Sequence, residues 1–390
     1  MKILVAPSGL KESVEPLEAV KYISSGVKKV FPTADIIGIP FVDGGEGTTK
    51  ALVSLTRGRL LHTRVTGPTS NKVDSYIGIL GKPNNRTALI EIAAAAGLKL
   101  IPRELRNPLL TTSYGVGELI KFALDHHVKE ILIGCGDSGV NDGGIGMAQA
   151  LGVVFKDQYG KNIGLVGSEI HKLDSIDISI LDPRIEEVKI QVALNTHNLL
   201  TGPKGVARVF GPQKGANRKQ VEQMSKAMDH LAAVIKKDLD LDVALMPGGG
   251  ASGGLGTGLY AFLGATLHSR YEIINMFTGL DDVLPTVDLI VTAEGCIDSQ
   301  TPYGKVPSFL AKKAKRYNIP VVVLAGTIGK GAKINYPAGI STYESILSKP
   351  ISLEDAIRHG SKLLEDASER VMRTIKTGMS LSNATLHKNP

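Results

Sequence analysis

The chain has 390 residues, 43% of them hydrophobic and 21% charged, which excludes a mainly disordered protein. Its formal net charge is +7, but the basic residues are spread along the chain instead of gathered in a tail or on one stretch, so a nucleic-acid-binding protein is not expected. Aromatic residues make up 5% and tryptophan is absent, which argues against a base-stacking surface, whereas glycine is over-represented with 44 residues.

The first sixty residues alternate between strand and helix patterns. Short apolar runs predict strands at 3–6 and 35–40, and apolar residues three and four positions apart predict helices at 13–30 and 47–55. Between residues 60 and 92, short β-branched runs are separated by glycine, proline and asparagine, which predicts hairpin-like strands.

The remainder returns to an alternation of helices and strands. Strands are predicted at 130–134, 188–193, 287–292 and 320–325. Helices are predicted at 114–126, 142–151, 218–237, 306–317 and 353–375. The last fifteen residues are polar, and we expect them to fray.

This order of elements predicts an α/β protein with two α/β domains. Residues 1–58 and 287–390 are expected to form a Rossmann-like domain with a parallel sheet. The β-rich middle, residues 59–286, is expected to form a second, mixed α/β domain inserted into the first.

Two features predict the compartment. No uninterrupted apolar run approaches 18 residues, and the apolar start of the chain is too short for a signal-peptide core, so no membrane association is expected. Cys135 and Cys296 are isolated, without the spacing of a metal site or a redox pair. We therefore expect a reduced, cytoplasmic protein.

Much of the glycine lies in short loops beside acidic residues. The first such loop, residues 43–48 (DGGEGT), lies between a predicted strand and a predicted helix. Gly44 and Gly45 would let backbone N–H groups approach an anion, and the carboxylates of Asp43 and Glu46 would fit a divalent cation beside it. A tight turn with an aspartate cap is the alternative, and the motif alone does not decide between them.

A second loop, residues 134–144, follows the strand at 130–134. Ser138 and Asp142 are its candidate ligand groups, although Asp142 is also a natural N-cap for the helix predicted after it. Residues 134–139 match the G-x-G-x-x-G pattern of dinucleotide-binding proteins, which leaves a nicotinamide-dependent oxidoreductase as an alternative. A single match of this kind has low specificity in a chain so rich in glycine.

Three further segments carry similar chemistry. Residues 247–258 hold Gly253 and Gly254 before an apolar helix, where they could donate N–H groups to phosphate or pack closely against another helix. Glu294, Asp298 and Lys305 follow a predicted buried strand, at the kind of sheet edge where α/β proteins bind ligands. Lys214 stands in a Gly-Pro turn, either as a phosphate contact or as a solvated residue. This mixture of glycine loops, carboxylates and lysines is typical of phosphoryl transfer.

Taken in order, these segments resemble the bacterial glycerate kinases of the ATP-dependent type I class. The matching segments are residues 6–13, 43–48, 111–120, 141–144, 202–203, 210–215, 253–256 and 294–307. The resemblance covers nearly the whole chain. It implies two α/β domains, one inserted into the other, and a kinase that transfers the γ-phosphate of ATP to a hydroxyl group of glycerate, with ATP and Mg²⁺ as cofactors.

Under this interpretation the candidate residues take three roles. The expected catalytic residues are Lys11, Asp43, Glu46 and Asp298. The expected nucleotide-binding residues are Gly44, Gly45, Ser138, Asp142, Gly253, Gly254, Glu294 and Lys305. The expected metal ligands are Asp43 and Asp298.

Several motif positions depart from the usual family pattern. They are Ser8, Gly9, Asp137, Asn195 and Cys296. These departures leave open a relative that acts on another small hydroxy-acid or that has a non-catalytic, sensing role. The expected partner is a small-molecule substrate, with neither nucleic acid nor membrane, and a homodimer is left open.

Overall fold

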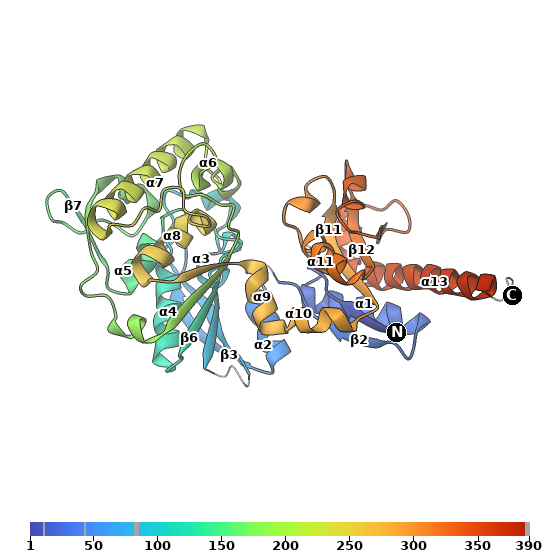
Figure 1. Cartoon of the computed structure of the whole chain (residues 1–390). Coiled ribbons are helices and arrows are strands. Elements are labelled where there is room, and N and C mark those ends of the chain that lie inside the picture. The colour runs from blue at the N-terminus through green and yellow to red at the C-terminus, as the bar shows by residue number, and fades with distance from the viewer. Residues whose placement is uncertain (11, 43, 82–85, 387–390) are drawn as a thin grey trace. The chain divides into compact units, whose positions relative to one another are not determined.

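The computed structural model describes residues 1–10, 12–42, 44–81 and 86–386, except for the side chains of residues 274, 276 and 382–386 (Figure 1). Contacts divide the chain into two units. Unit 1 consists of Met1–Val42 and Ile274–Pro390, and unit 2 of Asp43–Ile273. Unit 2 therefore lies, in sequence, between the two parts of unit 1.

Unit 1 is built on a five-stranded parallel sheet. Its strands are β1 (Lys2–Val5), β2 (Asp35–Gly38), β11 (Leu289–Ile297), β12 (Val321–Ile328) and β13 (Thr342–Ser345). Their order is β13-β12-β11-β1-β2, and every neighbouring pair is parallel. The strands β1, β11 and β12 are nearly continuous apolar runs, as expected for strands that are covered on both faces.

The longest helices of unit 1 pack against each other. They are α1 (Pro16–Val30) and α13 (Gly360–Leu386), accompanied by α10 (Leu280–Val283), α11 (Val306–Ala314) and α12 (Leu353–Arg358). A Cβ atom on Gly26 would lie 2.4 Å from the carbonyl oxygen of Glu365, so only glycine allows α1 and α13 to come this close. The hydroxyl of Ser368 donates to the carbonyl of Ile23 across the same contact, at 2.9 Å.

Unit 2 is built on a six-stranded mixed sheet. Its strands are β3 (Arg59–Thr66), β4 (Lys72–Ile79), β5 (Thr87–Glu91), β6 (Glu130–Gly134), β9 (Lys189–Leu194) and β10 (Thr266–Ser269). The order is β10-β9-β6-β5-β4-β3, with β3, β4 and β5 antiparallel and the pairs from β5 to β10 parallel. The strands β7 (Val154–Asp157) and β8 (Leu173–Asp177) form a separate antiparallel pair.

Helices accompany this sheet, and most of them share one large apolar core with it. They are α2 (Thr48–Thr56), α3 (Ala93–Ala96), α4 (Tyr114–Asp125), α5 (Ile145–Ala150), α6 (Val206–Phe210), α7 (Arg218–Leu239) and α8 (Ala251–Leu263). The helix α9 (Arg270–Thr278) runs across the point where the chain passes back to unit 1. Asn217 and Gln220 close the start of α7 with a reciprocal capping box.

The predicted fold class is confirmed, with one fully parallel and one mixed sheet. Contact grouping places α2 in unit 2, because α2 packs on β3, β4 and β5. The sequence-based domain bounds placed residues 47–58 in the first domain instead. The predicted domain bounds, residues 1–58 with 287–390 and residues 59–286, stay a prediction.

Several element predictions are wrong in detail. The first helix begins at Pro16 instead of residue 13, and the helix predicted at 142–151 is only Ile145–Ala150. The helix predicted at 353–375 is broken at His359 into α12 and α13. The helix α13 continues to Leu386, where a frayed tail was expected. The strands β7, β8, β10 and β13 are too short or too polar to stand out in the sequence.

Among the residues that the structure describes, no helix is both long enough and apolar enough to cross a membrane.

Candidate functional site

The turn before α2 lies against the end of β6. The backbone N–H of Glu46 donates to the carboxylate of Asp137 at 3.1 Å, and the Glu46 carboxylate pairs with Lys99 at 2.5 Å. A Cβ atom on Gly134 would lie 2.5 Å from the carbonyl oxygen of Gly44. Gly134 must therefore be glycine for the two backbones to touch, and the predicted residue Gly44 has a φ of 82°, which favours glycine there too.

Gly45 makes the same kind of contact one step further along. A Cβ atom on Gly136 would lie 2.5 Å from the Cα atom of Gly45. The two glycines of the turn before α2 thus face two glycines at the end of β6. The neighbouring candidate Asp43 lies outside the described residues.

Asp142 is completely buried and joins the starts of two helices. Its carboxylate accepts hydrogen bonds from the N–H and the hydroxyl of Ser113, at 2.7 and 2.8 Å, just before α4. It also accepts one from the N–H of Gly144 at 3.2 Å, just before α5. Burial raises the pKa of Asp142, and these hydrogen bonds oppose the shift. Its contacts are those of an internal anchor for two helix N-termini.

Ser138 meets a lysine that the sequence analysis left undecided. Lys214 is only 3% exposed, and its Nζ atom donates to Ser138 Oγ at 3.0 Å and to the carbonyl oxygen of Val140 at 2.7 Å. Burial lowers the pKa of Lys214 to about 7, although the charge of Asp142 acts in the opposite direction. The expectation of a solvated turn at Lys214 is therefore wrong.

The glycine-rich start of α8 lies on the same loop. Ser252, Gly253 and Gly254 have φ values of 54°, 76° and 92°, so the backbone of the first turn is not helical. A Cβ atom on Gly253 would lie 2.0 Å from the carbonyl oxygen of Val140. The carbonyl of Gly253 accepts a hydrogen bond from the N–H of Gly143 at 3.0 Å. The second alternative considered for these glycines, close packing, is what the structure contains.

The G-x-G-x-x-G match at residues 134–139 lacks the structure that this pattern needs. A dinucleotide-binding turn leads directly into a helix, whose N-terminus faces the pyrophosphate. Here the next helix, α5, begins only at Ile145, and Ser138 instead forms a bridge with Gly97. The motif that suggested a nicotinamide-dependent oxidoreductase therefore no longer supports that alternative.

Glu91 is a buried carboxylate beside the turn before α2, and the sequence analysis missed it. It accepts hydrogen bonds from the Tyr76 hydroxyl and from the N–H of Thr49 in the first turn of α2, the latter at 3.2 Å. Burial raises the pKa of Glu91, and both hydrogen bonds oppose this shift. The available signal was an acid ending an otherwise apolar strand, β5.

In unit 1, the predicted residues Asp298 and Lys305 form an ion pair of 3.1 Å after β11. The Lys305 ammonium also donates to the carbonyl of Cys296 at 2.7 Å. Asp298 Oδ1 accepts a further hydrogen bond from the N–H of Gln300 at 2.9 Å. Burial alone would raise the pKa of Asp298, but the bonds from Lys305 and Gln300 lower it below its usual value. Asp298 is thus held as a carboxylate anion.

Glu294 lies at the same end of the unit 1 sheet. The hydroxyl of Ser8, in the loop after β1, donates to the carbonyl of Ala293 at 2.7 Å and lies 3.3 Å from Glu294 Oε2. The strands β1 and β11 are parallel neighbours, so their carboxyl ends bring these residues together. The candidate Lys11 of this loop lies outside the described residues.

One oxygen of Asp298 could hold a metal ion. Three groups donate to Oδ1, from Lys305, Gln300 and Thr301, whereas Oδ2 accepts a hydrogen bond from the thiol of Cys296, whose sulfur lies 3.6 Å away. No group of three or more His, Cys, Asp or Glu side chains suited to a metal occurs in the part of the chain that the structure describes. A hard cation bound mainly by phosphate and water, through one or two carboxylates, fits this arrangement.

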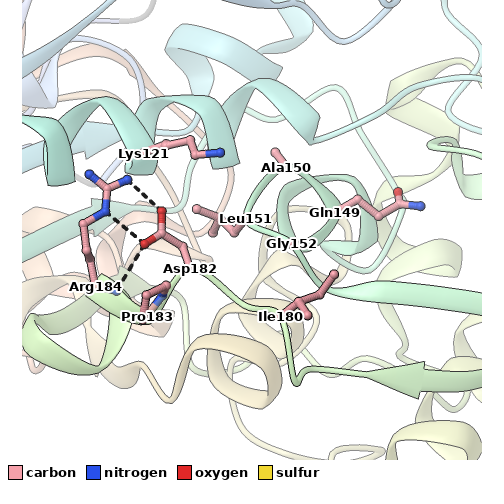
Figure 2. Close-up of a pocket in the computed structure, with 9 residues that line it drawn as sticks. All are labelled: Lys121, Gln149, Ala150, Leu151, Gly152, Ile180, Asp182, Pro183 and Arg184. Carbon is pink, nitrogen blue, oxygen red and sulfur yellow. Dashed lines mark hydrogen bonds and ion pairs between the residues drawn. The ribbon is translucent and has the colours of Figure 1, made fainter.

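A separate pocket of about 590 Å³ lies in unit 2 near the end of α5 (Figure 2). Arg184 lines it and is held by both Asp182 and Asp125, each at 2.7 Å. None of the residues predicted from the sequence lines this pocket. The Arg184 guanidinium group is already paired with two carboxylates, so the pocket is not a candidate phosphate site.

Comparison with known proteins covers almost the whole chain. The profile of the glycerate kinase family matches residues 3–376. The glycerate 2-kinase of Escherichia coli (strain K12) is 43% identical, over 97% of this chain and 99% of that protein. The glycerate kinase of Bacillus subtilis (strain 168) is 42% identical, over 98% and 99%.

A crystal structure supports the same assignment. The protein assigned as glycerate kinase 2 of Salmonella typhimurium LT2 superimposes with a TM-score of 0.83 at 43% identity. The match covers 98% of this chain and 100% of that one. With the family profile and the relatives agreeing over nearly their full lengths, this chain belongs to the glycerate kinase family.

Proposed function

We propose that this protein is an ATP-dependent kinase that transfers the γ-phosphate of ATP to a hydroxyl group of glycerate, giving a phosphoglycerate and ADP. The observation that carries the proposal is the similarity of about 42%, at nearly full length, to proteins named glycerate kinases. In the transfer, the acceptor oxygen forms a bond to the γ-phosphorus and the bond to the bridging oxygen of ADP breaks. The hydroxyl proton passes to a carboxylate base.

Unit 1 supplies a charged group suited to this chemistry. We assign catalysis to Asp298 and nucleotide binding to Lys305 and Glu294. Support comes from the ion pair between Asp298 and Lys305, which keeps one carboxylate anionic and one ammonium fixed at the end of β11. A fixed ammonium can stabilise negative charge that develops on phosphate oxygens.

Unit 2 supplies an acid and a hydroxyl. We assign Glu46 to catalysis and Ser138 to contact with the nucleotide. Glu46 is held through its N–H by Asp137 and through its carboxylate by Lys99, while Ser138 is held by Lys214. The roles of Asp43, as base or metal ligand, and of Lys11 stay predictions from the sequence.

The remaining candidates act by shaping these loops. The contacts of Asp142 with two helix starts, and the backbone contacts of the glycines, support a positioning role. The glycines concerned are Gly44, Gly45, Gly253 and Gly254.

Mg²⁺ is part of the proposal. Asp298 is the described residue that would hold it, and the metal-ligand role of Asp43 stays a prediction from the sequence. Bound there with ATP, the ion would neutralise charge on the phosphate oxygens. The chain's own share is to keep Asp298 ionised, which the Lys305 ion pair does.

The test is release of ADP from ATP and Mg²⁺ in the presence of D-glycerate, compared with a panel of other small hydroxy-acids and with no acceptor. We expect D-glycerate to give the highest kcat/KM. A higher value for another hydroxy-acid would replace glycerate as the substrate, and the motif departures at Ser8, Gly9, Asp137, Asn195 and Cys296 are the reason for the panel. Absence of turnover with every acid would contradict the proposed function and favour the sensing alternative.

A thermal-shift measurement separates the cofactor classes. ATP with Mg²⁺ should raise the melting temperature, because a ligand that binds only the folded state stabilises it. A shift with NAD or NADP in its place would contradict the kinase assignment. A cytoplasmic location and a homodimer stay predictions, and light scattering on the purified protein measures the second directly.

A further inference from the structure

Unit 2 contains a buried lysine that no carboxylate of the described residues contacts directly, although the charge of Asp142 acts on it. Lys214 is 3% exposed, and among the described residues no carboxylate oxygen lies within 4.0 Å of its Nζ atom. A buried ammonium is costly in free energy unless it is paired. A residue kept in such an environment is commonly tied to function.

The hydrogen bonds of Lys214 all go to one loop. Its Nζ atom donates to Ser138 Oγ and to the carbonyl of Val140. One side chain from another segment therefore ties together residues 138 and 140 of the loop after β6. An ammonium or amine group with two such acceptors fixes the rotamer of the Ser138 hydroxyl. Ser138 is itself buried, with 7% of the residue exposed.

The same loop contains polar groups that nothing in the described structure satisfies. Both polar atoms of the Asn141 side chain are buried without a hydrogen-bond partner, and Asn141 is 1% exposed. Buried polar groups are normally paired, and unpaired ones concentrate where structure serves function instead of stability. The loop after β6 thus contains buried polar atoms whose lack of partners costs stability.

Lys214 has a matched counterpart a few residues earlier. Lys204 stands in the turn Gly202-Pro203-Lys204-Gly205, and Lys214 in the similar Gly211–Gly215 segment. Lys204 is exposed, whereas Lys214 is buried on the loop. A lysine in this local sequence is therefore not buried by default. The burial of Lys214 results from its contacts with Ser138 and Val140.

We propose that Lys214 is a positioning residue for phosphoryl transfer, which acts by holding the hydroxyl of Ser138 in the loop after β6. The inference rests on the proposed function, in which Ser138 contacts the nucleotide. It assigns to Lys214 no contact with substrate. Its effect on the reaction passes through Ser138.

A double-mutant cycle tests this route of action. We expect Lys214→Met and Ser138→Ala each to lower kcat about 100-fold, because misplacement of a positioning group by about 1 Å can cost that factor. The double variant should then be within about threefold of either single variant, because both changes remove the same effect. KM for ATP and for glycerate should change by less than about threefold.

The control is Lys204→Met, which removes an exposed lysine from the similar turn and should leave kcat within about twofold of the wild type. If Lys214→Met fails to give a protein with the wild-type circular dichroism spectrum, Lys214→Leu replaces it in the cycle, because it also removes the N–H donors. Multiplicative effects of the two changes, or a Lys214 variant with wild-type kcat, would overturn the inference. A wild-type protein without turnover of any hydroxy-acid would overturn the proposed function first, and the inference with it.

Discussion

Lys305 in unit 1 and Lys214 in unit 2 both stand next to glycine in loops that contain candidate site residues, but their surroundings differ. The Lys305 side chain is 27% exposed and pairs with Asp298 at 3.1 Å. Lys214 is 3% exposed and contacts a hydroxyl and a carbonyl. Lys305 therefore forms a partly exposed ion pair, and its proposed role is contact with phosphate. Lys214 can lose its proton near neutral pH and serves to fix a loop.

The acids of the two units differ in the same way. The Oδ1 atom of Asp298 accepts hydrogen bonds from a lysine ammonium and a backbone N–H, whereas Asp142 accepts from groups at the N-termini of two helices. Two aspartates that look alike in the sequence thus have different tasks. Burial and the kind of hydrogen-bond donor therefore distinguish an acid proposed to contact a ligand, such as Asp298, from an acid that shapes a loop, such as Asp142.

The largest effect on catalysis should come from substitution of Asp298. Asp298→Asn should lower kcat about 10³-fold, within the range of 10² to 10⁴ typical for a positioned acid or base, because the substitution removes the negative charge that holds Lys305. Steady-state ADP release measures it, with Ser299→Ala, at the exposed neighbour, as control. A rate within threefold of the wild type would remove Asp298 from the mechanism.

The buried acid should instead affect stability. Asp142→Asn should lower the free energy of unfolding by about 3 kcal/mol, because the new amide nitrogen cannot accept from Ser113 and leaves buried donors unpaired. Urea denaturation followed by circular dichroism measures this change. The exposed Asp242 serves as a matched control, since Asp242→Asn should change stability by less than about 0.5 kcal/mol. Equal effects of the two substitutions would refute the anchoring role.

The buried lysine should make stability depend on pH. The pKa of Lys214 is about 7 in the folded protein, below its ordinary value of 10.5, so between these values the unfolded chain binds more protons. Stability must then rise with pH over this window. From pH 7 to pH 9 the wild type should gain about 2 kcal/mol relative to Lys214→Met, measured from urea midpoints. Parallel curves for both proteins would show that Lys214 stays protonated.

The smallest effect should come from the exposed ion pair. Lys305→Met should lower the free energy of unfolding by only about 1 kcal/mol or less, because partly exposed ion pairs contribute little to stability. Comparison with Lys214→Met in the same denaturation experiment sharpens the contrast between the two lysines. A loss several times larger for Lys305→Met would show that the unit 1 loop depends on this pair for its fold.

The sequence predicted the elements whose pattern is set locally. The strands β1 and β6 are plain apolar runs, and the prediction of β6 at residues 130–134 is confirmed at both ends. The break between α12 and α13 was not visible, because it depends on a contact distant in sequence. A Cβ atom on Gly360 would lie 2.0 Å from the Ser13 hydroxyl, so packing selects glycine at this point.

The site was predictable in its residue types but not in their environments. Asp298 and Lys305 were found together from spacing, since both follow one strand end. Glu91 and Lys214 could not be identified in this way, because burial of a charged side chain depends on residues from several segments. Glu91, for example, receives its hydrogen bonds from β4 and α2.

The paired glycines around the end of β6 have a consequence for how members of this family are recognised. The turn before α2, the loop after β6 and the start of α8 touch through backbone atoms at Gly44, Gly134 and Gly253. A methyl group on Gly134 or Gly253 would collide with the main chain, and Gly44 has a φ of 82°, so selection for folding alone would keep these motifs. A relative that had lost phosphoryl transfer would still carry the same glycine pattern. Under the roles proposed above, it is the loss of the charged residues Asp298, Lys305 and Lys214 that would mark a change of activity.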